Sequence, residues 1–201
     1  MSAALHLVPE NTTPADGNEA DQVDDWQGHT VAARWNPENQ LLGALMWMPC
    51  TRARTFLELI PDTAIWLPAN RWVFELIGRI VTAGRDPDPV TVLAYARQHA
   101  AAQALNAGQR PTASQHHRLA LHLADLYTHT VSPAHAVEYA REVLDEAYRR
   151  AVCAHGIRLQ QLAETGVART ELTEQMNANR AELADLWRRA DAAAQSDWDQ
   201  P

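Results

Sequence analysis

The chain has 201 residues, 46% of them hydrophobic, and a formal net charge of −8, which suits one packed domain with an appendage. No run approaches the roughly 18 to 20 consecutive apolar residues of a membrane span. The N-terminus also lacks the basic region followed by an apolar run that is typical of a signal peptide, so we expect a cytoplasmic protein. All 17 basic side chains are arginine, which excludes a Walker-type nucleotide loop because that loop needs a lysine.

The acidic charge is concentrated at the two ends of the chain. Residues 1–33 contain six acids and no arginine, and residues 191–201 contain three more acids. The body, 34–190, has 16 acids against 17 arginines, so it lacks the basic surface that dominates affinity for nucleic acid. Residues 1–24 are polar and interrupted by proline and glycine, which favours a disordered acidic tail over a lure for a basic partner. We expect a second short tail at 195–201.

Two helices are predicted at the start of the body. Residues 36–38 combine a capping asparagine, a proline at the first helical position and an acid favoured by the helix dipole. We expect this helix to run to Met48, with Gly43 permitting close approach of another segment. A short helix at 51–60 follows.

The most apolar helix is predicted between Pro68 and Gly84. Proline suits a first helical turn because its missing N–H would be unpaired there, and glycine suits the stop because it accepts a left-handed backbone. Apolar side chains cover most of this helix, and only Arg71, Glu75 and Arg79 form a polar stripe. Such a helix is central, because neighbours must bury it on several sides.

The remaining sequence also predicts helices and no strands. The pairs Asp88-Pro89 and Ser132-Pro133 each indicate a capped helix start. The predicted helices span about 89–107, 112–127, 133–164 and 170–194. The expected fold class is all-α, with a small helical bundle (25–148) around the central helix, followed by a C-terminal antiparallel helical hairpin (149–194).

The predicted hairpin has apolar residues that the rest of the chain cannot easily cover. Leu183, Leu186 and Trp187 lie at spacings of three and four on the last helix. Exposed apolar area of this kind usually marks an association surface, and a two-fold homodimer is the default for a self-complementary patch. We therefore expect Leu186→Asp to disrupt a dimer while the bundle stays folded. The predicted interface comprises Ile157, Leu159, Leu162, Leu172, Met176, Leu183, Leu186 and Trp187.

Two polar residues lie on the inner side of the predicted hairpin, where apolar side chains are expected. Gln175 and Asn179 are one helical turn apart. They either specify the register of the helices or mark an exposed edge, and the sequence does not decide between these interpretations.

No motif for catalysis, a cofactor or a metal is present, and HExxH, GxSxG and CxxC are all absent. Four histidines share one helical region, but only Asp125 accompanies them, which favours ordinary surface and helix-end histidines over a metal site. These are His116, His117, His122 and His129. Cys50 and Cys153 are far apart in sequence, which favours reduced thiols over a disulfide.

Several segments, in order, resemble the N-terminal domain of replicative hexameric helicases, the DnaB family. They are 38–46 (ENQLLGALM), 66–70 (WLPAN) with Val73-Phe74, 88–92 (DPVTV) and 131–140 (VSPAHAVEYA), with Arg149-Arg150 beyond them. The resemblance covers about 36–190. Asn70 departs from the family, because a histidine is common at its position.

The resemblance implies a small helical bundle and a hairpin through which the domain dimerises. It also implies a place in the collar of a hexamer, where primase and loader proteins dock. The chain ends where the family's RecA-like motor would begin, so we expect no helicase or ATPase activity. The expected function is a non-enzymatic, replication-linked interaction protein with primase, replicative helicase or a loader as partner. The alternatives are a helical DNA-binding transcriptional regulator and an enzyme with an unrecognised acid or histidine site.

Overall fold

The computed structural model describes residues 33–101 and 110–195. The chain divides into two units after Ala33, and the second unit, Arg34–Pro201, holds all the helices below. The described residues contain helices and no strand, which confirms the all-α prediction. The α-helices are α2 (Pro37–Leu45), α3 (Cys50–Leu59), α4 (Pro68–Thr82), α5 (Pro89–Ala96), α6 (Ala113–Thr128), α7 (Ala136–Glu164) and α8 (Arg169–Gln195). Two short 3₁₀ helices are also present: η1 (Asp62–Ala64) lies between α3 and α4, and η2 (Pro133–His135) lies between α6 and α7.

Three helix boundaries differ from the prediction. The first helix ends at Leu45 rather than Met48, because Pro49 disfavours the helical conformation in the residue before it and the intervening residues form a turn. Helix α5 ends at Ala96, and the expected continuation to 107 falls largely outside the described residues. Ser132 makes no capping hydrogen bond, because its proline begins a 3₁₀ turn and α7 starts three residues later. The predicted tails, 1–24 and 195–201, also lie almost wholly outside the described residues.

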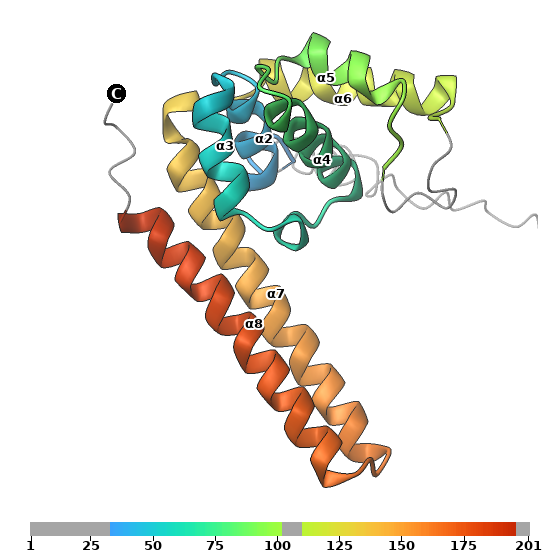
Figure 1. Cartoon of the computed structure of the whole chain (residues 1–201), viewed down its shortest axis with the longest axis vertical. Coiled ribbons are helices and arrows are strands. Elements are labelled where there is room, and N and C mark those ends of the chain that lie inside the picture. Colours follow the sequence, from blue (N-terminus) through green and yellow to red (C-terminus); the bar gives the residue numbers. More distant parts are fainter. Residues whose placement is uncertain (1–32, 102–109, 196–201) are drawn as a thin grey trace, which may run out of the picture. The chain divides into compact units, whose positions relative to one another are not determined.

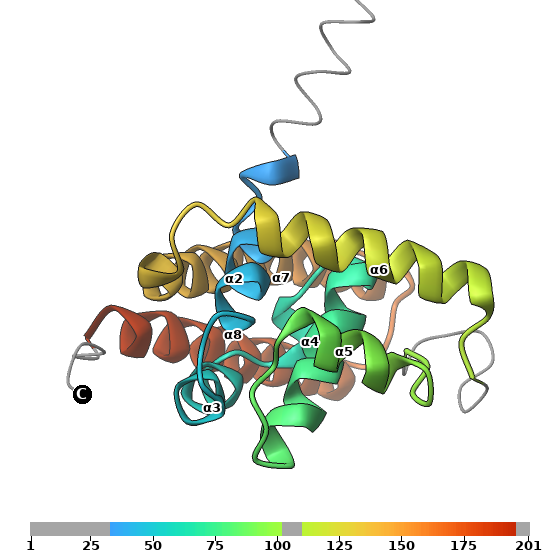
Figure 2. The ribbon, with the colours of Figure 1, turned by 90° about the horizontal axis from the view of Figure 1, so that it is seen from above.

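Helix α4 is the central helix, as predicted. It packs against α2, α3 and α5 (Figures 1 and 2), and its apolar side chains are almost completely removed from solvent. The buried side chains of α4 are Asn70, Val73, Phe74, Leu76, Ile77, Ile80 and Val81. Gly84 follows the helix with φ +72°, the left-handed conformation that favours glycine.

Helix α2 contacts the end of α6 closely at Gly43. A Cβ atom at this position would lie 1.8 Å from the Thr130 hydroxyl oxygen and 2.5 Å from the Leu126 carbonyl oxygen. Gln40, one turn earlier and buried, accepts a hydrogen bond from the Val131 N–H at 2.8 Å and donates to the His129 carbonyl at 2.9 Å. The predicted close approach at Gly43 is therefore present, and Gln40 holds the facing segment in place.

A buried carboxylate joins α2 to the start of α4. Glu38 is 2% exposed, and its two oxygens accept hydrogen bonds from the N–H groups of Trp66 (2.7 Å) and Leu67 (3.1 Å). The Asn70 side-chain amide also donates to Glu38, at 3.3 Å. The guanidinium of Arg150, on α7, lies 4.0 Å away, so the buried charge is both hydrogen-bonded and compensated.

The same network continues through Asn70 to His122 on α6. The Asn70 amide nitrogen donates to Asn39 at 2.7 Å as well as to Glu38, so its carbonyl oxygen is left as the acceptor for the His122 ring. The His122 Nε2 atom lies 2.7 Å from that oxygen and must therefore be the donor. Burial lowers the pKa of His122 below its ordinary value, and the opposing effect of Asp125 only reduces this shift.

Helix α7 is shared between the bundle and the pair of long helices. Its first half, up to Ala147, is buried in the core, whereas beyond Arg150 it packs along α8 and extends away from the other helices (Figure 1). The C-terminal turns of α8 return to the bundle. There Arg189 donates to the carbonyl groups of Glu58 (3.1 Å) and Leu59 (2.9 Å). No described helix is long and apolar enough to cross a membrane.

We expect Glu38→Ala to lower the free energy of unfolding by about 3–5 kcal/mol. The substitution leaves buried N–H donors and the Arg150 guanidinium without their acceptor. Urea denaturation followed by circular dichroism measures the change. Glu142→Ala, which removes an exposed acid from α7, is the control and should change stability by less than about 0.5 kcal/mol. Equal effects of the two substitutions would contradict the role of the buried carboxylate.

The lowered pKa of His122 predicts a pH-dependent stability. Below the ordinary histidine pKa, about 6.5, His122 binds a proton in the unfolded chain, whereas in the folded chain it takes up the proton only at a lower pH. This contribution to stability is therefore present above that pH and is lost as the pH falls through the folded pKa. We expect His122→Gln to lose less stability than the wild type between about pH 7.5 and pH 5.5. His117→Gln, at an exposed position, should keep the wild-type dependence, and urea midpoints at each pH decide the comparison.

Candidate interaction surface

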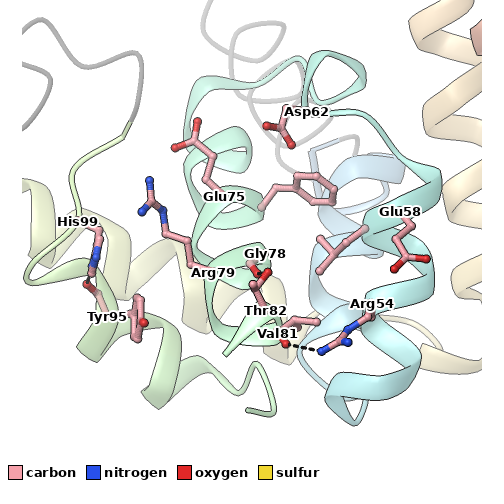
Figure 3. A pocket seen from close by; sticks show the side chains of 12 residues that line it. Arg54, Glu58, Asp62, Glu75, Gly78, Arg79, Val81, Thr82, Tyr95 and His99 are labelled. Atoms are coloured by element: carbon pink, nitrogen blue, oxygen red, sulfur yellow. Dashed lines mark hydrogen bonds between the residues drawn. The ribbon is translucent and has the colours of Figure 1, made fainter. Parts of the chain in front are cut away.

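A hollow of about 900 Å³ lies between α3, α4 and α5 (Figure 3). Phe74 and Val81 form an apolar floor, and the Arg54 guanidinium donates to the Val81 carbonyl oxygen at 3.1 Å. Charged residues of both signs surround the floor, with Glu75 and Arg79 side by side on α4 (Figure 3). The hollow is open and mixed in charge, without the dry, convergent polar groups typical of an active site.

The lining of this hollow contains no pair of a nucleophile and a base. It has no cysteine, serine or lysine among the described residues, and the Thr82 hydroxyl donates to the Gly78 carbonyl at 2.7 Å. Tyr95 stacks on His99, with ring centroids 4.8 Å apart. Across the described ranges 33–101 and 110–195, no group of three or more His, Cys, Asp or Glu side chains could hold a metal ion.

A second hollow, the hairpin groove, lies along α7 and α8 and has a volume of about 640 Å³. Its walls are mainly apolar, and several of them face solvent, with Met176 59% and Trp187 60% exposed. The groove is lined by Tyr148, Val152, His155, Gly156 and Leu159 of α7 and by Met176, Asn179, Arg180, Leu183, Ala184 and Trp187 of α8. Of the hollows in the described structure, this groove is lined by the most predicted interface residues.

Four of the predicted interface residues line the hairpin groove: Leu159, Met176, Leu183 and Trp187. The other four do not. Ile157 is 59% exposed and is not part of the groove lining, and Leu162 and Leu172 lie half-buried nearer the far turn. Leu186 is only 6% exposed and belongs to the buried apolar core. The expectation that Leu186 faces a partner is therefore wrong, because its own chain already covers it.

Sequence reasoning predicted only Leu159 on the α7 side of the groove and missed its neighbours on the same helix face. Tyr148, Val152, His155 and Leu159 follow one another at spacings of four, three and four, which places them on one helix face. This signal is present in the sequence, but a tyrosine and a histidine interrupt the aliphatic pattern. Helical spacing alone could have found the stripe if aromatic and amphipathic side chains had been counted with the aliphatic ones.

Polar residues mark the middle of the hairpin groove. Asn179 is 5% exposed, and its side-chain oxygen accepts a hydrogen bond from Gln175 at 2.7 Å, so it is a buried polar residue and not an exposed edge. Its amide nitrogen has no hydrogen-bond partner among the described residues. One turn further along, Glu182 lies 3.2 Å from the ring of His155 and links α8 to α7. The groove thus combines apolar walls with two buried side-chain nitrogens, those of Asn179 and His155, that make no hydrogen bond within the described residues.

Comparisons with known proteins identify the family. The DnaB-like helicase N terminal domain matches residues 32–145, which is more than half of the chain. The chain belongs to this family. Its structure is similar to the crystal structure of the N-terminal domain of DnaB helicase from Mycobacterium tuberculosis, with a TM-score of 0.58 and 22% sequence identity. That likeness covers 73% of this chain and 95% of the other, and no curated protein sequence matches.

The DnaB N-terminal-like region matched by the family ends inside α7. Residues 32–145 contain Glu38 with its hydrogen-bond donors, the central helix and most of the core half of α7, but neither Arg150 nor the hairpin groove. The family assignment therefore rests on the bundle, and it gives the α7–α8 surface no function by itself.

The burial of Leu186 predicts that Leu186→Asp unfolds the chain rather than only separating copies. Replacing a core leucine by an acid removes apolar packing and buries a charge, so we expect a loss of at least about 3 kcal/mol. Trp187→Asp, at the exposed neighbouring position, should cost less than about 1 kcal/mol in the isolated chain. Urea denaturation at one low protein concentration compares the two variants. Equal midpoints would show that Leu186 is not a core residue.

Proposed function

We propose that this protein is a non-enzymatic, replication-linked interaction module that pairs with a second copy through the hairpin groove and docks to replicative helicase, primase or a loader. Membership of the DnaB N-terminal domain family supports the link to helicase assembly. The single observation that carries the self-association is the exposed apolar lining of the hairpin groove. A groove of this kind in a chain with an otherwise well-buried core usually marks a contact surface.

The composition of the hairpin groove suits a two-fold contact between copies. Trp187 is a large, rigid side chain with an apolar body, and such residues often dominate the energy of an interface. It lies beside Leu183 and opposite the α7 stripe, so that each copy offers both an anchor and a groove. A surface with both features is self-complementary, and the closed arrangement of such surfaces is a symmetric dimer.

Asn179 supplies register to the proposed dimer. Its unmet amide donor is costly wherever it is surrounded only by apolar groups. Arrangements of two copies that provide an acceptor to this donor, directly or through water, avoid that cost, whereas shifted arrangements do not. A single buried polar residue in a helical interface selects pairing in this way. Interpreting Asn179 as a register residue is therefore preferred to interpreting it as a neutral surface position.

We expect the purified chain to dimerise at micromolar concentration and Trp187→Asp to make it monomeric. The aspartate places a charge in a surface that becomes desolvated on pairing, which costs several kcal/mol unless it finds a partner. Sedimentation velocity measures the mass, and circular dichroism confirms that the helices remain. Leu121→Asp, an exposed apolar-to-acid change on α6, is the matched control and should leave the dimer intact.

Two outcomes would overturn the self-association. One is a wild-type chain that sediments as a monomer at micromolar concentration. The other is a Trp187→Asp variant that stays folded and dimeric. The docking part of the proposal is tested separately by mixing the chain with purified helicase, primase or loader from its host and measuring co-elution in size-exclusion chromatography. Co-elution with none of the three would exclude it.

A further inference from the structure

One stretch of this acidic protein, which runs from the start of α5 into α6, lacks acidic side chains. Between Asp88 and Asp125 the sequence contains no aspartate or glutamate, but it contains Arg97, Arg110 and Arg118. The whole chain has 25 acids and 17 basic residues, so an acid-free stretch of this length is a local reversal of the overall charge. Arg118, the arginine of this stretch that lies on α6, can therefore attract a negatively charged group with no acid close to it in sequence.

A groove of about 380 Å³ opens where α6 meets the first turns of α4. Pro68 and Ala69 are exposed on one wall, and Trp72 is half-buried between the walls with its indole N–H donating to the His99 carbonyl at 3.1 Å. Leu119 closes the floor from α6 and is 3% exposed. The groove is therefore apolar inside, and its volume lies at the small end of ligand hollows, about 300–1,000 Å³.

Two arginines line this α4–α6 groove and have N–H donors that make no hydrogen bond to other described residues. Arg118 is exposed and makes no hydrogen bond or ion pair within the described parts of the chain. Arg71 donates from Nε (3.0 Å) and Nη2 (2.7 Å) to the Ile65 carbonyl, which fixes the guanidinium, and its Nη1 atom makes no hydrogen bond to another described residue. A fixed guanidinium and a free one at the rim of an apolar groove are suited to bind carboxylates.

We propose that the α4–α6 groove binds a short acidic peptide segment of a partner protein. One large apolar side chain of that segment enters between Trp72 and Leu119, and flanking carboxylates pair with Arg118 and Arg71. The inference rests on the proposed function, because it assigns the docking contact to a surface separate from the hairpin groove. This surface therefore selects partner helices or loops in which a large apolar side chain lies between acidic residues.

The same surface is poorly suited to nucleic acid. Affinity for a duplex comes mainly from neutralising many phosphates, and only two arginines line this groove. The lining also contains one acid, Glu75, so its two arginines leave a formal net charge of only +1, which suits a pair of carboxylates at the rim better than a run of phosphates. Bases do not stack well in this groove, because the indole of Trp72 is half-buried and hydrogen-bonded to the backbone of His99, and the ring of His122 is hydrogen-bonded to Asn70. The apolar walls are instead matched to an amino-acid side chain.

The test uses the full chain and a fluorescein-labelled synthetic peptide with a central Trp-Leu pair between runs of aspartate and glutamate. Fluorescence anisotropy at low salt should give a Kd on the order of 10–100 μM, the weak affinity of one anchor with exposed ion pairs. Replacing all acids of the peptide by their amides, or the Trp-Leu pair by serines, should weaken binding at least about tenfold. An amide peptide that binds equally well would overturn the role of the arginines.

Variants of the protein locate the binding. Arg118→Glu and Ala69→Glu should each weaken peptide binding about tenfold or more, because they place an acid at the rim and leave the buried core intact. Arg97→Glu is the matched control. It changes the net charge of the same acid-free stretch by the same amount but lies outside the groove, so it should change the Kd less than about twofold. Equal losses for Arg118→Glu and Arg97→Glu would overturn the site in favour of a diffuse charge effect.

Three other results would also overturn the proposal. These are no peptide binding at millimolar peptide, insensitivity to Arg118→Glu, and tighter binding of a labelled DNA duplex or single strand that depends on Arg118. Sedimentation of the same samples separates this inference from the proposed self-association. A dimer that does not bind the peptide rejects only the α4–α6 groove, whereas a monomer that binds it rejects only pairing through the hairpin groove.

Discussion

The buried carboxylate of Glu38 is the interaction on which the arrangement of the helices depends. A charge removed from water is tolerated only where hydrogen bonds and a countercharge replace its hydration. Here the replacements come from different parts of the chain: the N–H groups that precede α4, the Asn70 amide within α4, and Arg150 on α7. Arg150 also donates to the Ala64 carbonyl at 2.6 Å and lies 5.4 Å from the centre of the Trp66 ring. One side chain of α2 thereby positions the segment that starts α4 and the helix that leaves the bundle.

Much of the fold could be predicted from local chemistry, because the relevant interactions are local. The apolar surface of α4 predicted its burial, and the caps at Asn36 and Asp88 accept the expected hydrogen bonds from Glu38 (2.8 Å) and Val90 (2.9 Å). Ser132 failed as a cap although its sequence context was the same, because a 3₁₀ turn intervenes. The Glu38 network could not be predicted, since its partners lie 28 to 32 residues away in sequence or further.

The candidate surface shows where helical spacing stops being informative. Spacing identifies residues that share a face, but it does not say which neighbour covers that face. Leu186 and Trp187 are adjacent, so they point about 100° apart, and the structure buries the first and exposes the second. The return of α8 to the bundle through Arg189 decides this difference. The sequence predicts that α8 is an amphipathic helix, but it does not predict that α8 is held by hydrogen bonds to backbone carbonyl groups at the end of α3.

Helix α7 is continuous from Ala136 to Glu164, and this continuity has a mechanical consequence. At 1.5 Å per residue the helix is a rod of about 43 Å, with one end in the core of the bundle and the other in the hairpin. The Thr165–Gly166 turn lies at its far end, where Gly166 has φ +69°. In any assembly joined at the hairpin, the angle at which two such rods cross sets the distance between the two globular bodies. A change of a few degrees in this crossing angle therefore displaces the α4–α6 grooves by several ångströms, because they lie far from the crossing point.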